Sequence, residues 1–138
     1  MSQTVFTKFD ALFRAYGVNL YMNGHAHNYQ HIAPFDKDLK TPDACVKSGS
    51  SVYKRCAGYV NVVVGSPGNR ENESKPDTSR TPPKNLMPFF SSNFGFGHLT
   101  ANASALHFQW EQVKAFNAAS ARFEKVAGAF ADELWITL

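Results

Sequence analysis

The sequence predicts a strand-rich α+β fold for this chain of 138 residues. One amphipathic helix opens the chain, several short apolar runs follow it, and turn-forming residues separate the runs. With 43% hydrophobic residues, a chain of this length has enough apolar surface for one modest core. We therefore expect a single unit over residues 1–138.

The expected helix covers residues 5–16, where apolar side chains recur at helical spacing before Gly17 stops the helix. Residues 18–22 and 59–64 are nearly continuous apolar runs, which is typical of strands buried on both faces. A helix, a tight turn and a strand form an αβ unit. Functional residues of such units usually follow the carboxyl end of the strand.

The rest of the chain is predicted to form strands and loops. Further strands are expected at residues 94–101, 105–112 and 134–136, with loops at residues 34–51 and 69–88. Residues 113–126 fit either a helix or a long hairpin.

The charge pattern and the hydropathy pattern exclude two classes of partner. The formal net charge is only +3, and no stripe of Lys and Arg interleaved with aromatic side chains occurs, so we expect no nucleic-acid partner. No apolar run approaches the length of a membrane span, and residues 1–8 lack the apolar core of a signal peptide. We therefore expect no membrane association and no signal peptide in this chain.

The two cysteines, Cys45 and Cys56, lie in a polar, loop-like part of the sequence. They form either a disulfide, worth about 2–3 kcal/mol by loop entropy, or two free thiols. The loop setting favours the disulfide. Asn72-Glu73-Ser74 and Asn102-Ala103-Ser104 match the N-glycosylation acceptor pattern.

Two histidines, His25 and His27, follow Gly24 directly after the first apolar run. Residues two apart in an extended segment point the same way, so both imidazoles are candidate ligands of one metal or of two metals held close together. We expect Gly24 to adopt an unusual backbone angle before the first ligand. A His-x-His pair is common by chance, and its place after a strand is what favours a metal site.

Other polar and aromatic residues are assigned more general roles. Asn23, Asn28, Gln30 and His31 are candidates for hydrogen bonds around the metal ligands, and His31 is alternatively exposed or in contact with substrate. We expect His98 to be a hydrogen-bonded structural residue rather than part of a site, and His107 to face solvent. Trp110 and Trp135 are expected in the core.

The segment Gly24-His25-Ala26-His27-Asn28-Tyr29-Gln30 resembles the Gly-His-x-His-x-Tyr-Glu-Arg block of purple acid phosphatases, in the calcineurin-like metallophosphoesterase superfamily. Further resemblances follow in the same order along the chain, at residues 59–65, Gly68-Asn69, Phe96-Gly97-His98-Leu99, 102–104, Trp110 and 132–136. The resemblance implies the C-terminal part of a metallophosphoesterase α/β sandwich.

The resemblance also implies a reaction and its metal ions. His25 resembles a ligand of the divalent ion, which is zinc, manganese or iron in the family, and His27 resembles a ligand of the ferric ion. Gln30 and His31 replace the usual Glu-Arg. The implied activity is that of an acid phosphatase, in which two metal ions bind a phosphate monoester, activate a water molecule and stabilise the charge that develops during hydrolysis.

Most of the site lies outside this sequence. The family's Asp, Asp-x-x-Tyr and Gly-Asn-His-Glu motifs and its catalytic histidines are upstream, and none is present here, so no catalytic residue is assigned. We expect residues 1–138 to be the C-terminal portion of a catalytic domain, inactive without its N-terminal part. The resemblance implies that the full-length protein is a glycoprotein that is secreted or lysosomal/vacuolar. The alternative is a non-catalytic β-rich interaction module or a degenerate paralogue.

Overall fold

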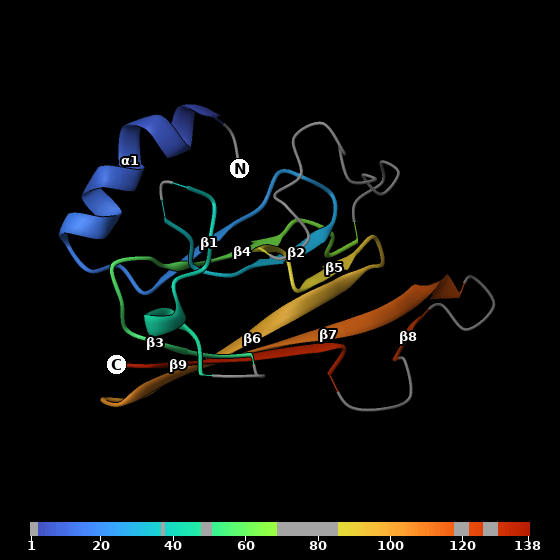
Figure 1. The fold of residues 1–138 in the computed structure, drawn as a ribbon. Helices are drawn as coiled ribbons and strands as arrows, with labels where there is room; N and C mark the ends of the chain where they lie inside the picture. Colours follow the sequence, from blue (N-terminus) through green and yellow to red (C-terminus); the bar gives the residue numbers. More distant parts are fainter. Residues whose placement is uncertain (1–2, 37, 48–50, 69–85, 118–121, 126–129) are drawn as a thin grey trace.

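The computed structural model describes residues 3–36, 38–47, 51–68, 86–117, 122–125 and 130–138. Two sheets lie in layers, and one helix lies on the side of the first sheet that faces away from the second (Figure 1). The helix α1, Gln3–Ala15, confirms the expected helix, and Gly17 ends it at a φ of 63°. No helix in these described ranges has the length and apolarity needed to cross a membrane.

The first sheet has the order β1-β4-β2-β5. Its strands are β1 (Leu20–Asn23), β2 (Tyr29–Ile32), β4 (Val60–Val64) and β5 (Phe89–Ser91). β1 runs parallel to β4, with Leu20 opposite Val60, whereas β2 runs antiparallel to both β4 and β5. The parallel pair brings the carboxyl ends of β1 and β4 to the same edge of the sheet.

The second sheet has the order β3-β9-β7-β6, and β8 pairs with the far part of β7. Its strands are β3 (Val52–Lys54), β6 (Gly95–Ala101), β7 (Ala105–Asn117), β8 (Arg122–Lys125) and β9 (Asp132–Thr137). Within the predicted range 113–126, the described residues 113–117 and 122–125 belong to the antiparallel pair β7 and β8 and not to a helix. A short 3₁₀ turn, η1 (Asp43–Cys45), precedes β3.

The hydrophobic core lies between the two sheets. Tyr29 of the first sheet stacks on Trp110 of the second, with ring centroids 4.6 Å apart. Gly97 makes room for the ring of Phe108, because a Cβ on this glycine would lie 2.5 Å from Phe108 Cε2. The other members of this core are Ala33, Tyr53, Val60, Val62, Leu134 and Ile136.

The structure corrects three sequence expectations. β4 is buried as predicted, but β1 is not, because it lies at the edge of the described sheet and Met22 is 42% exposed. Trp110 is in the core, whereas Trp135 is 39% exposed on the outer face of the second sheet. The strands β2, β3 and β5 were not predicted; each is only three or four residues long.

Candidate metal centre

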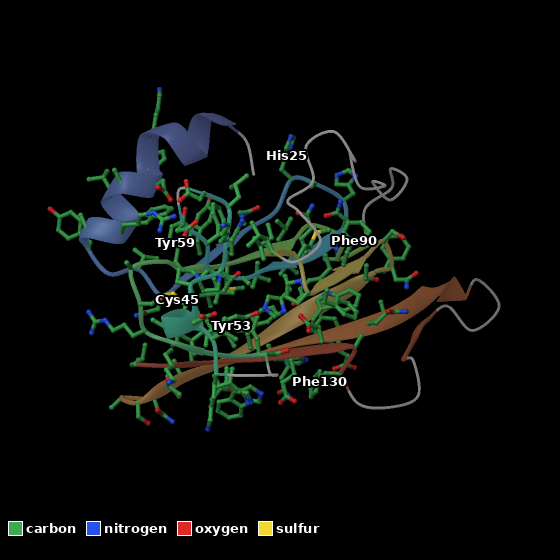
Figure 2. The ribbon with its side chains drawn as sticks, in the orientation of Figure 1. His25, Cys45, Tyr53, Tyr59, Phe90 and Phe130 are labelled. Atoms are coloured by element: carbon green, nitrogen blue, oxygen red, sulfur yellow. A yellow bond between two sulfur atoms is a disulfide. The ribbon has the colours of Figure 1, made fainter. Side chains whose placement is uncertain are left out.

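The candidate metal ligands lie on a loop of residues 24–28, here called the histidine loop, which joins β1 to β2. The loop begins directly after Asn23, so it lies at the carboxyl end of β1 and beside the carboxyl end of the parallel strand β4. His25 is exposed and its side chain points away from both sheets (Figure 2). His27 is partly exposed. The αβ unit therefore places both imidazoles where such folds usually bind ligands.

The backbone of the histidine loop differs from the expected extended segment. His25 has a φ of 75°, in the left-handed region that residues with a side chain rarely adopt. Gly24, which was expected to take the unusual angle, is not among the described glycines with a positive φ, so that expectation was wrong. The loop bends at His25, and the argument that His25 and His27 point the same way in an extended chain does not apply to it.

Polar side chains support the loop at both ends. Asn23 Nδ2 donates a hydrogen bond to Asn61 Oδ1 of β4, over 2.8 Å. Asn28 is buried, and its Oδ1 accepts a hydrogen bond from Gln30 Nε2 at 2.9 Å. Three of the four residues expected to form hydrogen bonds around the ligands therefore make contacts next to the loop.

The fourth of these residues, His31, has a different place. It is fully buried on β2, so neither solvent exposure nor contact with substrate from a loop applies to it. Its Nδ1 lies 2.9 Å from Asp132 Oδ2, and its Nε2 lies 2.8 Å from the hydroxyl of Tyr53. Tyr29 donates to the same Asp132 oxygen over 2.6 Å. The four side chains form a buried polar network between the two sheets.

The network perturbs the titration of its members. Burial alone would raise the pKa of Asp132, but hydrogen bonds and charge interactions with His31, together with the Tyr29 hydroxyl, lower it below the ordinary aspartate value. The pKa values of Tyr29 and Tyr53 are raised, first by burial and then by the negative charge of Asp132. Asp132 is therefore ionised and the tyrosines are protonated at neutral pH.

Sequence reasoning missed this network because its members are distant along the chain. Asp132 follows His31 by 101 residues, and Tyr53 follows it by 22. No local pattern in the sequence identifies these residues as partners.

The remaining histidines lie on the outer face of the second sheet. His98 is exposed and lies 3.2 Å from Glu111 Oε2, in agreement with a hydrogen-bonded structural role. His107 faces outward as expected, but it stacks on Trp135 with centroids 3.7 Å apart and lies 2.6 Å from Glu133 Oε1. The strand register keeps both on the face opposite the core, away from the two-sheet interior.

The donor chemistry of the loop fits a transition-metal ion only in part. Imidazole nitrogens are suitable ligands for zinc and iron, and His25 and His27 present two of them at an exposed edge. A metal centre needs more than two protein ligands. Within the described ranges, no group of three or more His, Cys, Asp or Glu residues is placed to hold a metal ion. The loop therefore supplies part of a ligand set.

Two known proteins are similar to this chain. The chain is 23% identical over 121 residues to an acid phosphatase of Aspergillus ficuum, covering 87% of this chain and 17% of that protein. A purple acid phosphatase, PPD1, from yellow lupin (Lupinus luteus) seeds has a similar fold, with a TM-score of 0.61, 23% identity, and coverage of 94% of this chain and 19% of that structure. The chain thus spans less than a fifth of the length of these relatives.

One family matches more than half of the sequence. Residues 58–129, from the loop before β4 through the β7–β8 hairpin, match the family described as iron/zinc purple acid phosphatase-like protein C. The fold expected from the sequence, the C-terminal part of a metallophosphoesterase sandwich, agrees with the strand-rich two-sheet structure. The chain belongs to this purple acid phosphatase-like family.

Proposed function

We propose that this chain supplies His25 and His27 to the two-metal centre of an acid phosphatase that hydrolyses phosphate monoesters. The observation that carries the proposal is the strained backbone of His25, with its φ of 75°, on an exposed loop at the carboxyl end of β1. Strained residues concentrate at functional sites, so the outlier points to a functional role for His25. The family's description, which names iron and zinc, adds the metal ions.

The two histidines take different ions in this proposal. His25 binds the divalent ion, which is zinc, manganese or iron, and His27 binds the ferric ion. When bound, such ions would supply charge stabilisation and activation of water, and the role of this chain would be to hold the two imidazoles in place. The ferric ion is a stronger Lewis acid than the divalent ion, which suits an enzyme that is active at acidic pH.

We propose that the rest of the ligand set comes from an N-terminal part of the catalytic domain, which packs against α1 and β1. Both elements have exposed apolar side chains: Phe9 (45%) and Leu12 (50%) on α1, and Met22 (42%) on β1. β1 is also an edge strand of the described sheet, so its outer hydrogen-bonding groups are available for another strand. In this proposal, binding of the N-terminal part covers the exposed surface of α1 and β1 and also completes the metal site.

The proposed location of the full-length protein is outside the cell or in a lysosome or vacuole. Cys45 and Cys56 form a disulfide in the structure, which is typical of oxidising compartments. Asn102 lies in the exposed turn between β6 and β7. The second triplet, at Asn72, lies outside the described residues. We propose Asn102 as the glycosylated residue.

A chimera tests the proposed activity. Residues 1–138 replace the matching segment of the Aspergillus ficuum acid phosphatase, and hydrolysis of p-nitrophenyl phosphate is measured. We expect turnover by the chimera, none by residues 1–138 alone, and none by the chimera carrying His25→Ala or His27→Ala. His107→Ala, on the outer face of the second sheet, is the matched control and retains turnover.

Two results would contradict the proposal. Turnover by the His25→Ala and His27→Ala chimeras would exclude both residues as ligands. A chimera that folds and binds metal but hydrolyses nothing would favour the alternative function, a non-catalytic β-rich module.

A further inference from the structure

The histidine loop rests on β4 and the residue that follows it. Before the loop, Asn23 is hydrogen-bonded to Asn61. After the ligands, Gly65 N–H donates to the carbonyl oxygen of Asn28 over 3.0 Å. Between these two points, the backbone of Ala26 lies directly against Gly65. Ala26 separates the two candidate ligands, so this contact lies at the centre of the loop.

Gly65 is needed at this contact because of space. A Cβ on Gly65 would lie 2.7 Å from the carbonyl carbon of Ala26 and closer still to its oxygen. These are backbone atoms, so no side-chain rotation relieves the overlap. Gly65 is not among the described glycines with a positive φ, so its conformation alone does not demand glycine. Gly24 provides a contrast, because its Cβ would meet Val64 O at an ordinary 3.5 Å.

We infer that Gly65 is a positioning residue for the metal ligands, an inference that rests on the proposed function. The missing side chain lets the loop lie on the end of β4, and this support keeps His25 at its strained φ of 75°. A strained residue persists only where the surrounding structure determines its conformation. Asn61 and Gly65 provide such contacts at the two ends of the loop.

Gly65→Ala in the 138-residue chain tests the inference by NMR. A residue with a positive φ gives a strong NOE between its own amide proton and Hα, and we expect His25 to show this NOE in the wild type and to lose it in Gly65→Ala. We also expect the affinity for zinc, followed through the imidazole resonances of His25 and His27, to fall roughly 10- to 100-fold.

Gly97→Ala is the matched control. It adds the same methyl group at a glycine in close contact, but against Phe108 in the core. We expect it to lower the stability of the fold while the His25 NOE and the zinc affinity stay at wild-type values. This separates an effect on the loop from a general loss of stability.

A measurement on the wild type covers the case in which Gly65→Ala does not fold. The Gly65 amide should exchange slowly with solvent, and more slowly with zinc present, because its hydrogen bond to Asn28 closes the loop. Exchange that zinc does not slow would overturn the inference, as would an unchanged NOE and zinc affinity in Gly65→Ala. Where the wild-type chain alone binds no zinc because the proposed N-terminal ligands are absent, the NOE comparison decides the role of Gly65, and the chimera described above tests the proposed function.

Discussion

His31 on β2 and Asp132 on β9 join the two sheets through a hydrogen bond of 2.9 Å between Nδ1 and Oδ2. Asp132 is ionised because its pKa is lowered, so it has no proton to offer and the Nδ1–H of His31 donates. The Nε2 of His31 meets the Tyr53 hydroxyl of β3. The buried carboxylate of the second sheet is thus satisfied by two side chains of β2, His31 and Tyr29, and Tyr53 of the second sheet contacts His31 in turn.

The variant Asp132→Asn tests how much this network contributes to the free energy of unfolding. The amide keeps the shape of the side chain but removes the charge, and it brings its own N–H₂ toward the Tyr29 and His31 donors. Removing one partner of a buried pair typically costs several kcal/mol, so we expect a loss of about 3 kcal/mol in the free energy of unfolding. Urea denaturation measures this loss.

Glu133→Gln is the control for that measurement. It makes the same chemical change one residue further along β9, where the carboxylate is half exposed and pairs with His107. Exposed pairs contribute little, so the expected loss is below about 1 kcal/mol. Equal losses in the free energy of unfolding of the two variants would show that the buried network around Asp132 stabilises the fold no more than the exposed pair does.

The lowered pKa of Asp132 also predicts how stability changes in acid. A carboxyl group whose pKa is lower in the folded state stabilises the fold fully above the unfolded value of about 3.9, and this contribution is lost as the pH falls through the lower folded value. The difference in Tm between the wild type and Asp132→Asn should therefore be constant near neutral pH and shrink below about pH 4. Thermal melts across this range test it, and a difference that grows in acid would contradict it.

The same residues show what the sequence could predict and why. The helix, β4, β6 and the closing strand β9 have strong local patterns, and the structure confirms them. The strand β2 has no such pattern, because Gln30 and His31 interrupt its apolar residues. It becomes a strand only through pairing with β4 and β5 and through the network that satisfies His31.

The candidate site was predictable in its residues but not in its geometry. The position of His25 and His27 after β1 follows from the sequence, and the ligand assignment stays a prediction. The positive φ of His25 depends on contacts with Asn61 and Gly65, which are about 40 residues away along the chain. Local reasoning placed the strain on Gly24 because glycine is the residue that adopts such angles most readily.

The disulfide between Cys45 and Cys56 gives a further prediction. It closes a loop with a sequence separation of 11, which connects η1 to the segment after β3. Loop entropy in the unfolded chain makes such a bond worth about 3 kcal/mol, so a reducing agent should lower the Tm. The double variant Cys45→Ala/Cys56→Ala should melt at the lower temperature with or without the reducing agent. A wild-type Tm that is insensitive to complete reduction would contradict the prediction.

Arg14 attaches the C-terminal end of α1 to the rest of the fold. Its Nη1 donates to the carbonyl oxygen of Ala57 at 3.0 Å and its Nη2 to that of Phe35 at 2.9 Å, while Nε contacts Asp10 at 2.8 Å. The Asp10 carboxylate in turn accepts a hydrogen bond from the Tyr59 hydroxyl at 3.0 Å. One guanidinium therefore connects the helix to two separate loops.

Arg14→Lys keeps the positive charge but cannot reproduce the planar arrangement of donors. We expect a loss of about 2 kcal/mol in the free energy of unfolding, because the charged hydrogen bonds to the carbonyl oxygens of Phe35 and Ala57 are lost. Faster amide exchange in α1 than in β4 should accompany it, since the contacts that fail are those of the helix. Arg55→Lys makes the same substitution at an exposed position and should change stability by less than about 0.5 kcal/mol. If Arg14→Lys were equally mild, the packing of Phe13 on Tyr21 and Tyr59 would be sufficient to hold the helix.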